Sequence, residues 1–444
     1  MDDIGEARRL CERWLAAKPI CDDAMYLSTA GLLMAARCEH FDMEDSRQAA
    51  LAVHDGYRRT HLDFGLVFHG SISGAAAFAA GDPCAARALY EDTLNLAINY
   101  PGLANTFAAS PALLLAEVHY EQNRLEDAQA LVLQYIDVAY GAGYVDKLVA
   151  GYITKARLEL LKGQHEPAQR TLDEAERCAL TTGFERLRVH VVAERMRQFV
   201  HRGLNTQVLE LAQKNGLLGG TLTFAAREGA TTKEEMLALA WARAASVRGD
   251  LDGAIRLIKN WVHFTASRAA RRSSIRLGVE LSRLMFLRGN HGGAYRAMVE
   301  ALRATRPGDF VRTFLDGGPG TREVLGWIAN TATHENTADT QHAAILLDAF
   351  AHTTEHAAAQ QRTQPGNTTA ANLQRFTRRE IDILELAGTG VPNKEIGKRM
   401  SLSENTVKWY WKSIFAKLGV RRRFDAVNAA RAAGVLTHLP RDFT

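Results

Sequence analysis

A turn followed by an alanine returns along the first 300 residues of the chain, in steps near 40 residues or twice that. The alanines that follow these turns are Ala7, Ala86, Ala128, Ala168, Ala254 and Ala294. A weaker copy ending at Val208 halves the gap between Ala168 and Ala254. Apolar helical stretches flank each turn, and the small alanine allows two helices to approach closely. The pattern therefore predicts helical hairpins that stack into a right-handed superhelix.

A set of unrelated helical bundles is the alternative, but it would not repeat one turn at one period. The first turn lies at residues 2–7, so the chain begins on the second helix of a hairpin. Either a half repeat caps the fold, or the chain corresponds to the back end of a longer architecture.

The composition favours helix over sheet, since only 10 of the 444 residues are proline and Ala, Leu and Arg are abundant. We therefore expect an all-α protein. No run of about 18 apolar residues could span a bilayer, and the charged segment Met1 to Ala17 is unlike a signal peptide. The 5 cysteines are widely spaced and form no C-x-x-C pair, which predicts buried thiols in a reducing cytoplasm.

Three features of the repeat region could hold a ligand, but a structural interpretation of each is stronger. The glycine- and threonine-rich segment from Asn215 to Thr232 is interpreted as a tolerated insertion. His352 and His356 are four apart, a spacing compatible with a metal, but no acidic or sulfur ligand accompanies them, so a polar helix end is favoured. A basic run is expected to form a solvated face between hairpins: Arg268, Arg271, Arg272 and Arg276.

The end of the repeat region is marked by a polar segment with a Pro-Gly pair, Gln360 to Asn372, which predicts a flexible linker. Two further helical stretches precede it, Thr321 to Ala329 and Ala338 to Ala359. We therefore predict a helical-repeat sensor domain at 1–359, the linker at 360–372, a second domain at 373–436 and a tail at 437–444.

The second domain carries the cationic excess of the chain. Residues 373–436 contain 13 Lys and Arg against 6 Asp and Glu, a net charge of +7 that leaves −3 for the rest of a chain whose total is +4. A polyanion is the partner that this excess favours, since phosphate neutralisation supplies much of the affinity of DNA-binding domains.

Two short helical patterns joined by a tight turn lie in this domain, between Asn393 and Val420. In the second pattern, apolar residues at spacings of three and four form one face: Val407, Tyr410, Trp411, Ile414 and Leu418. The opposite face carries Asn405, Lys408, Trp409 and Lys412. Ser403 stands where it can cap this helix. The arrangement is typical of a helix-turn-helix that enters a major groove.

Two more helices complete the expected module. Thr377 and Glu380 form a capping-box pattern for a helix that glycines end at Gly390. The first helix of the helix-turn-helix is predicted at Asn393 to Met400, and the last helix of the domain at Phe424 to Ala433. We therefore expect four helices in about 60 residues.

The segment from Phe376 to Val427 resembles the DNA-binding domain of the LuxR (LuxR/NarL/FixJ) family of bacterial transcription regulators. The matching positions are Thr377, Arg379, Glu380, Leu384, Gly390, Asn393, Lys394, Glu395, Ile396, Ser403, Thr406, Val407, Lys408, Ile414, Lys417, Leu418, Gly419, Val420 and Ala426. Upstream, the helical repeats and the segment FVRTFLDGG, which ends at Gly318, are similar to the sensor region of MalT-like members. This resemblance implies tetratricopeptide-like hairpins.

The chain departs from that family in four ways. Large MalT-like members normally carry an N-terminal nucleotide-binding domain, but this chain contains no G-x-x-x-x-G-K-[ST] loop, so ATP binding and hydrolysis are not carried over. The half repeat at Met1 fits a chain that begins downstream of that domain. It has no receiver-domain pattern of alternating strands and helices. Pro392 replaces the usual small hydroxyl residue, which leaves Asn393 as the expected helix cap. Tyr410 replaces the usual His on the inward face, where it should alter packing more than recognition.

The resemblance, together with the helix faces, implies a set of DNA-binding residues. Lys408, Trp409 and Lys412 would meet the major groove, where the lysines reach guanine edges or phosphates. Asn393 and Ser403 belong to the set as caps. The residues expected to hold the DNA backbone are Lys394, Thr406, Lys417, Arg421 and Arg422.

The sequence thus predicts a sequence-specific transcription regulator, an activator, whose repeats sense a small ligand or a protein partner. It would bind double-stranded DNA as a homodimer, on half-sites about one helical turn apart, and contact RNA polymerase. The alternative is a helical-repeat interaction scaffold with the C-terminal module used for assembly, which gives no reason for cations around a recognition helix. No catalytic, cofactor or metal site is predicted, because no nucleophile-base, metal-ligand or phosphate-loop constellation is present.

Overall fold

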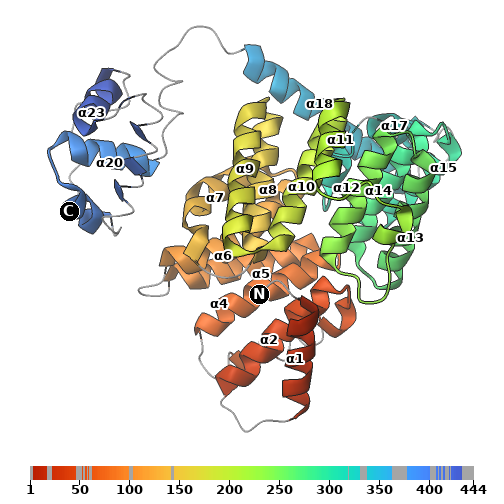
Figure 1. Ribbon diagram of the computed structural model, residues 1–444, viewed down its shortest axis with the longest axis horizontal. Coiled ribbons are helices and arrows are strands. Elements are labelled where there is room, and N and C mark those ends of the chain that lie inside the picture. The colour runs from red at the N-terminus through yellow and green to blue at the C-terminus, as the bar shows by residue number, and fades with distance from the viewer. Residues whose placement is uncertain are drawn as a thin grey trace. The chain divides into compact units, whose positions relative to one another are not determined.

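The computed structural model describes residues 4–17, 23–46, 53, 56–57, 59, 63–99, 104–141, 145–318, 320–330, 338–362, 378–400, 407–408, 410–411, 414–415, 420 and 422–432. Every regular element among them is a helix, so the predicted all-α fold is confirmed. The chain divides into two compact units, residues 1–357 and 358–444 (Figure 1).

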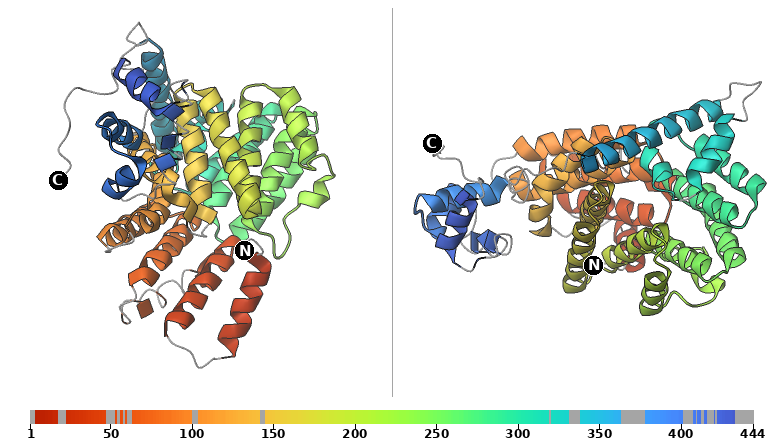
Figure 2. Two further views of the ribbon diagram at one scale, coloured as in Figure 1. Left: turned by 60° about the vertical axis from the view of Figure 1, so that its left-hand side comes forward. Right: turned by 90° about the horizontal axis from the view of Figure 1, so that it is seen from above.

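The first unit is a series of helical hairpins. Its α-helices are α1 (Ile4–Ala16), α2 (Asp23–Glu39), α4 (Asp63–Ala79), α5 (Pro83–Asn99), α6 (Ala104–Glu121), α7 (Leu125–Tyr135), α8 (Val145–Leu161), α9 (His165–Thr182), α10 (Glu185–His201), α11 (Asn205–Lys214), α12 (Thr232–Val247), α13 (Leu251–Ser267), α14 (Arg271–Leu287), α15 (His291–Arg303), α16 (Val311–Leu315), α17 (Thr321–Asn330) and α18 (Ala338–Arg362). Two 3-10 helices are η1 (Ile136–Gly141) and η2 (Thr221–Phe224). Successive hairpins stack in chain order around a curved core, which Figure 2 shows from two sides.

One turn geometry joins the two helices of each hairpin. The residue with a positive φ in these turns is Phe41, Gly81, Asn123, Gly163, Gly203, Gly249 or Gly289. Five residues later the chain places Ser46, Ala86, Ala128, Ala168, Val208, Ala254 or Ala294, and each of these side chains is 0% exposed. The period predicted from the sequence is therefore confirmed from Ala86 to Ala294, whereas the turn predicted before Ala7 lies partly outside the described residues. The sequence pattern did not include the Phe41 turn. Phenylalanine there takes a left-handed conformation that glycine adopts more easily, and Ser46 stands where most repeats have alanine.

The last repeats return to the first ones, although solenoid repeats ordinarily contact only their neighbours. Helix α14 packs against α4, and α16 packs against α6. Phe78 and Phe310 stack with ring centroids 5.6 Å apart and planes 5° apart. Tyr120 and Asp316, separated by 196 positions, share a hydrogen bond. The superhelix therefore curls into a unit with an interior.

The segment from Asn215 to Thr232 is held on the following hairpin. The indole Nε1–H of Trp241 donates to the Gly219 carbonyl at 2.8 Å, and that of Trp261 donates to the Phe224 carbonyl at 2.8 Å. Two buried tryptophans thus obtain acceptors from this segment. These contacts agree with its interpretation as a structural insertion.

The second unit contains α20 (Arg378–Gly388), α21 (Asn393–Arg399) and α23 (Arg423–Ala432) around a small core of its own. Gly390, with φ +85°, follows α20 and agrees with the predicted end of that helix. The bounds of α21 and α23 lie within one residue of the predicted ones. Thr377 of the predicted capping box lies outside the described residues.

Helix α18 continues to Arg362, three residues into the segment predicted as a flexible linker. The helix continues this far because the alanines and glutamines before Arg362 are strong helix formers. The rest of the predicted linker lies outside the described residues, as do the side chains of His352 and His356. Among the described helices, none combines the length and the apolar character needed to cross a membrane.

Candidate nucleic-acid interface and interior cavity

The predicted recognition helix is described at residues 407–408, 410–411 and 414–415, all of them helical. Its apolar face is buried, with at most 4% exposure at Val407, Tyr410, Trp411 and Ile414. Lys408, from the opposite face, is exposed. The predicted division into an inward apolar and an outward cationic face is confirmed for these residues, and so is the inward position of Tyr410.

Asn393 does not cap α21, and this prediction is wrong. The capping position belongs to Pro392, whose carbonyl accepts from the Ile396 amide at 2.9 Å, so Asn393 is the first residue of the helix rather than its cap. The Oδ1 atom of Asn393 instead accepts the indole Nε1–H of Trp411 at 2.9 Å. Asn393 therefore joins the start of α21 to the recognition helix.

Arg423 is a structural residue of this site that sequence reasoning missed. Its guanidinium lies 5.4 Å from the Trp411 ring centroid and donates to the Val391 carbonyl. Burial lowers the pKa of Arg423. These contacts join the start of α23 to the turn before α21. In the sequence Arg423 follows two other arginines, and nothing distinguishes the arginine that packs from Arg422, which is exposed.

The predicted DNA-binding residues are placed only in part. Lys394, Lys408 and Arg422 are exposed, and Asn393 is half-buried. The other members of the set lie outside the described residues: Ser403, Thr406, Trp409, Lys412, Lys417 and Arg421. Their assignment to DNA contacts stays a prediction.

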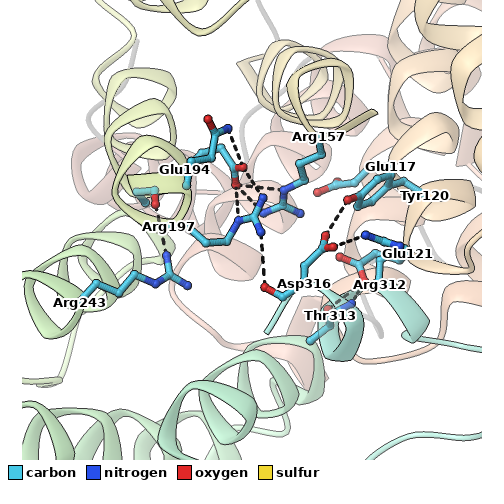
Figure 3. Close-up of polar contacts among 12 residues, drawn as sticks. Glu117, Tyr120, Glu121, Arg157, Glu194, Arg197, Arg243, Arg312, Thr313 and Asp316 are labelled. Atoms are coloured by element: carbon cyan, nitrogen blue, oxygen red, sulfur yellow. Dashed lines mark hydrogen bonds and ion pairs between the residues drawn. The ribbon is translucent and has the colours of Figure 1, made fainter. Parts of the chain in front are cut away.

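The first unit encloses a cavity of about 580 Å³. Helices from both ends of the series line it, because the last repeats return to the first. Seven arginines reach it: Arg157, Arg186, Arg197, Arg243, Arg272, Arg276 and Arg312. Figure 3 shows the polar contacts at one side of this interior.

Two arginines converge on one glutamate at the centre of this cluster (Figure 3). The Nε atom of Arg157 lies 3.0 Å from Glu194 Oε2, and Nη2 of Arg197 lies 2.6 Å from Glu194 Oε1. Burial alone would raise the pKa of Glu194, but the two guanidinium groups outweigh burial and hold this pKa well below its usual range. Glu194 is therefore ionised and shared by two cations.

Helix α16 supplies the opposite side of the cluster. Arg312 pairs with Asp316 one turn further on, and Tyr120 of α6 donates its hydroxyl to Asp316 Oδ2 at 2.6 Å. The backbone N–H and the hydroxyl of Thr313 both donate to Glu121, at 3.0 and 2.8 Å. These bonds fix α16 against α6 and hold Arg312 in the wall of the cavity.

The basic run from Arg268 to Arg276, at the end of α13 and the start of α14, does not form a solvated face, and that prediction is wrong for three of its four arginines. Arg272 pairs with Glu117, and its guanidinium lies 3.9 Å from the Phe78 ring centroid. Arg276 pairs with Glu235 at 2.6 Å, and Arg268 pairs with Asp42 at 3.0 Å. Only Arg271 is exposed among the four. The carboxylates belong to other hairpins, which the sequence does not place opposite α14.

Sequence reasoning therefore expected a sensing surface but did not identify the residues of this cavity. The segment FVRTFLDGG, which contains Arg312 and Asp316, indicated only a family resemblance in the sequence. Its polar pair at a spacing of four is the signal that could have been used, since such a pair on an otherwise apolar segment is expected to be buried and paired.

Comparison with known proteins agrees with the two-unit division. Residues 1–326 match the family model described as the MalT-like TPR region, and residues 374–430 match the luxR family of bacterial regulatory proteins. A segment of 61 residues is 43% identical to the HTH-type transcriptional regulator AlkS of Alcanivorax borkumensis, covering 14% of this chain and 7% of that protein.

Two other relatives extend this result. The HTH-type transcriptional activator RamA of Corynebacterium glutamicum is 40% identical over 62 residues, 14% of this chain and 22% of that protein. The HTH-type transcriptional regulator MalT of Klebsiella pneumoniae is 25% identical over 158 residues, 34% of this chain and 18% of that protein. The matched segments thus span less than a quarter of the length of these three curated relatives.

Proposed function

The chain belongs to the family of MalT-like TPR regions and carries a DNA-binding domain of the luxR family, and on this premise we propose that it is a transcription regulator whose helical repeats sense an effector. The observation that carries the proposal is the recognition helix, with Val407 and Ile414 buried and Lys408 exposed. Together with the net charge of +7 on residues 373–436, it supports recognition of double-stranded DNA.

The finer features of the proposal follow from the same domain. The protein acts in the cytoplasm and contacts RNA polymerase. It is an activator, a role that the name of the RamA relative supports. It binds DNA as a homodimer on two half-sites. It is not an enzyme, since the families that it matches are regulators. Lys408, Trp409 and Lys412 read the major groove.

A double substitution tests the DNA contacts. A binding sequence is first selected from random duplexes with the full chain, and the chain with Lys408→Ala and Lys412→Ala is then titrated in a gel shift. We expect specific binding to be lost, because two cations leave the groove-facing side, while the circular dichroism spectrum stays unchanged.

Lys398→Ala is the matched control for this experiment. Lys398 is 69% exposed, lies on the neighbouring helix α21 and pairs with Glu395 at 3.7 Å, and it is outside the predicted contact set. Its substitution should leave the affinity for the selected duplex within about twofold. Unchanged affinity in the double variant, or an equal loss in the control, contradicts the assignment.

Salt dependence separates the regulator from an interaction scaffold. Phosphate contacts release counterions, so the logarithm of the DNA affinity should fall linearly with the logarithm of the salt concentration. The double variant should show a shallower slope than the natural chain. A scaffold that uses its second domain for assembly would show no salt-dependent affinity for DNA.

A further inference from the structure

The cavity in the first unit has two ends of different chemistry. At one end, α1, α2 and α4 present apolar side chains that include Leu10, Leu32 and Ile72. Leu10 is 45% exposed and Leu32 is 49% exposed, although both line a concave surface. At the other end, α8, α10, α12 and α16 present the arginine cluster of Figure 3. Such a space suits an amphiphilic molecule, with one apolar and one polar end.

Formal charge alone does not choose the polar group, because seven carboxylates accompany the seven arginines in the lining. The carboxylates, however, already have donors. Those in the cluster of Figure 3 are each ion-paired or hydrogen-bonded: Glu117, Glu121, Glu194 and Asp316. A cationic ligand would have to displace a guanidinium or a hydroxyl to reach any of them.

The guanidinium groups, in contrast, have donors left over. Arg312 is 2% exposed, and its Nε and Nη1 atoms have no hydrogen-bond partner among the described residues. Among the described residues, Arg243 donates to the Ala193 carbonyl at 3.2 Å and reaches Glu280 at no less than 3.4 Å, which is long for an ion pair. Buried N–H groups without a good acceptor are costly, so this end of the cavity favours a ligand that brings acceptors.

The surroundings of His190, which also lines the cavity, agree with an excess of positive potential. Burial, and after it the charges of Arg276 and Arg186, lower the pKa of His190 well below its usual range. The imidazole is therefore neutral at pH 7, and it adds a hydrogen-bonding group without adding a negative charge.

We propose that this cavity binds a small organic anion, with its carboxylate or phosphate group against Arg312 and Arg243 and its apolar body against Leu10 and Leu32. The volume of about 580 Å³ suits a ligand of this kind, since pockets for small molecules occupy about 300–1,000 Å³. The inference rests on the proposed sensing function of the repeats and names the chemical class of the effector.

The test uses the full chain and four probes. Three of them share an eight-carbon apolar chain, and the fourth shares its phosphate group with one of these three. Sodium octanoate and octyl phosphate carry the two anionic heads, 1-octanol is the neutral analogue, and inorganic phosphate lacks the body. Binding is measured by isothermal titration and by ligand-observed NMR at millimolar concentrations. We expect octanoate or octyl phosphate to bind at least tenfold more tightly than 1-octanol and inorganic phosphate, and the stronger of the two identifies the head group.

Two cavity variants and one control locate the site. Arg312→Met removes the guanidinium and should weaken binding of the preferred anion about tenfold or more. Leu32→Asp alters a half-exposed position at the apolar end, keeps every ion pair of the cluster and should weaken binding similarly. Arg288→Met changes an exposed arginine that pairs with Asp252 on the outer surface, and it should leave binding unchanged.

The proposal is overturned if 1-octanol binds as tightly as both anions, if none of the probes binds, or if folded Leu32→Asp binds like the natural chain. Should Arg312→Met fail to fold because Asp316 loses its partner, the Leu32 variant still decides. Gel shifts with the selected duplex are run on the same samples. Intact DNA binding without anion binding rejects the effector class alone, whereas anion binding without DNA binding rejects the regulator.

Discussion

Lys147, in α8, is a fully buried lysine whose Nζ atom has no hydrogen-bond partner among the described residues. Burial lowers its pKa from 10.5 to about 8. A lowered pKa in the folded state means that the unfolded chain binds the proton more tightly. The buried ammonium therefore costs stability at pH 7, and this cost shrinks as the pH rises from about 8 to 10.5.

We predict that Lys147→Met stabilises the first unit by about 1–3 kcal/mol at pH 7, because the apolar chain is kept and the buried charge is removed. Thermal and urea unfolding at pH 7 and pH 10 check this. The difference between variant and natural chain should be smaller at pH 10. A variant that is less stable at pH 7, or a difference that grows with pH, would show that Nζ has a partner in solution.

Single residues also show where sequence reasoning reaches its limit in the second unit. The inward position of Tyr410 followed from helical spacing alone, and it is confirmed. The predicted cap at Asn393 was wrong, because the Asn393 side chain bonds instead to Trp411, which lies 18 positions away in the sequence. Helical periodicity determines which side of a helix is buried, but the partner of a polar atom depends on which helices meet.

At the scale of elements, the hairpin is defined by two positions five residues apart. A residue with positive φ reverses the chain, and the fifth residue after it packs where the second helix meets the first. Alanine fills that position in most repeats, serine fills it at Ser46 and valine at Val208. The position needs a small or β-branched side chain, because the helices approach closely there.

We predict that Ala128→Leu destabilises the first unit by about 1–3 kcal/mol, because the added volume has no space at a fully buried position. Ala130→Leu, an exposed position on the same helix α7, is the matched control and should change stability by about 0.5 kcal/mol or less. Urea unfolding followed by circular dichroism measures both. Equal effects of the two substitutions would show that the position is not a close-packing site.

At the scale of the whole first unit, contacts between distant repeats set this chain apart from an open solenoid. Phe310 is 2% exposed and stacks on Phe78, and Arg306 pairs with Asp82 at 3.2 Å. Such contacts couple the stability of the first hairpins to that of the last. The same closure brings α16 to the arginine cluster and encloses the cavity.

We predict that Phe310→Ala, which removes a stacked ring at a cost of about 3–5 kcal/mol, increases amide hydrogen exchange in α4 and α5 as well as in α16. Hydrogen–deuterium exchange measured by mass spectrometry on the full chain checks this. Leu222→Ala, at a side chain that is 91% exposed, is the control and should change neither region. Faster exchange confined to the segment around α16 would mean that the repeats are not coupled across the closure.

The sequence by itself determined the class of helical repeats, the period of the hairpins and the inward and outward faces of the recognition helix. These features depend on local conformation and on helical spacing, which a short stretch of sequence contains. The matched families agree with the sensor and DNA-binding resemblance that was drawn from quoted motifs.

Only the tertiary structure decided that the repeats close on themselves, that Arg272 and Arg276 point inward, and that Arg312 lies buried in the wall of a cavity. Each of these depends on pairs of residues far apart in the sequence, such as Arg272 with Glu117, 155 positions away. The curvature of the stack accumulates from small rotations between hairpins. No local pattern encodes that sum, and so the cavity is formed only in the folded chain.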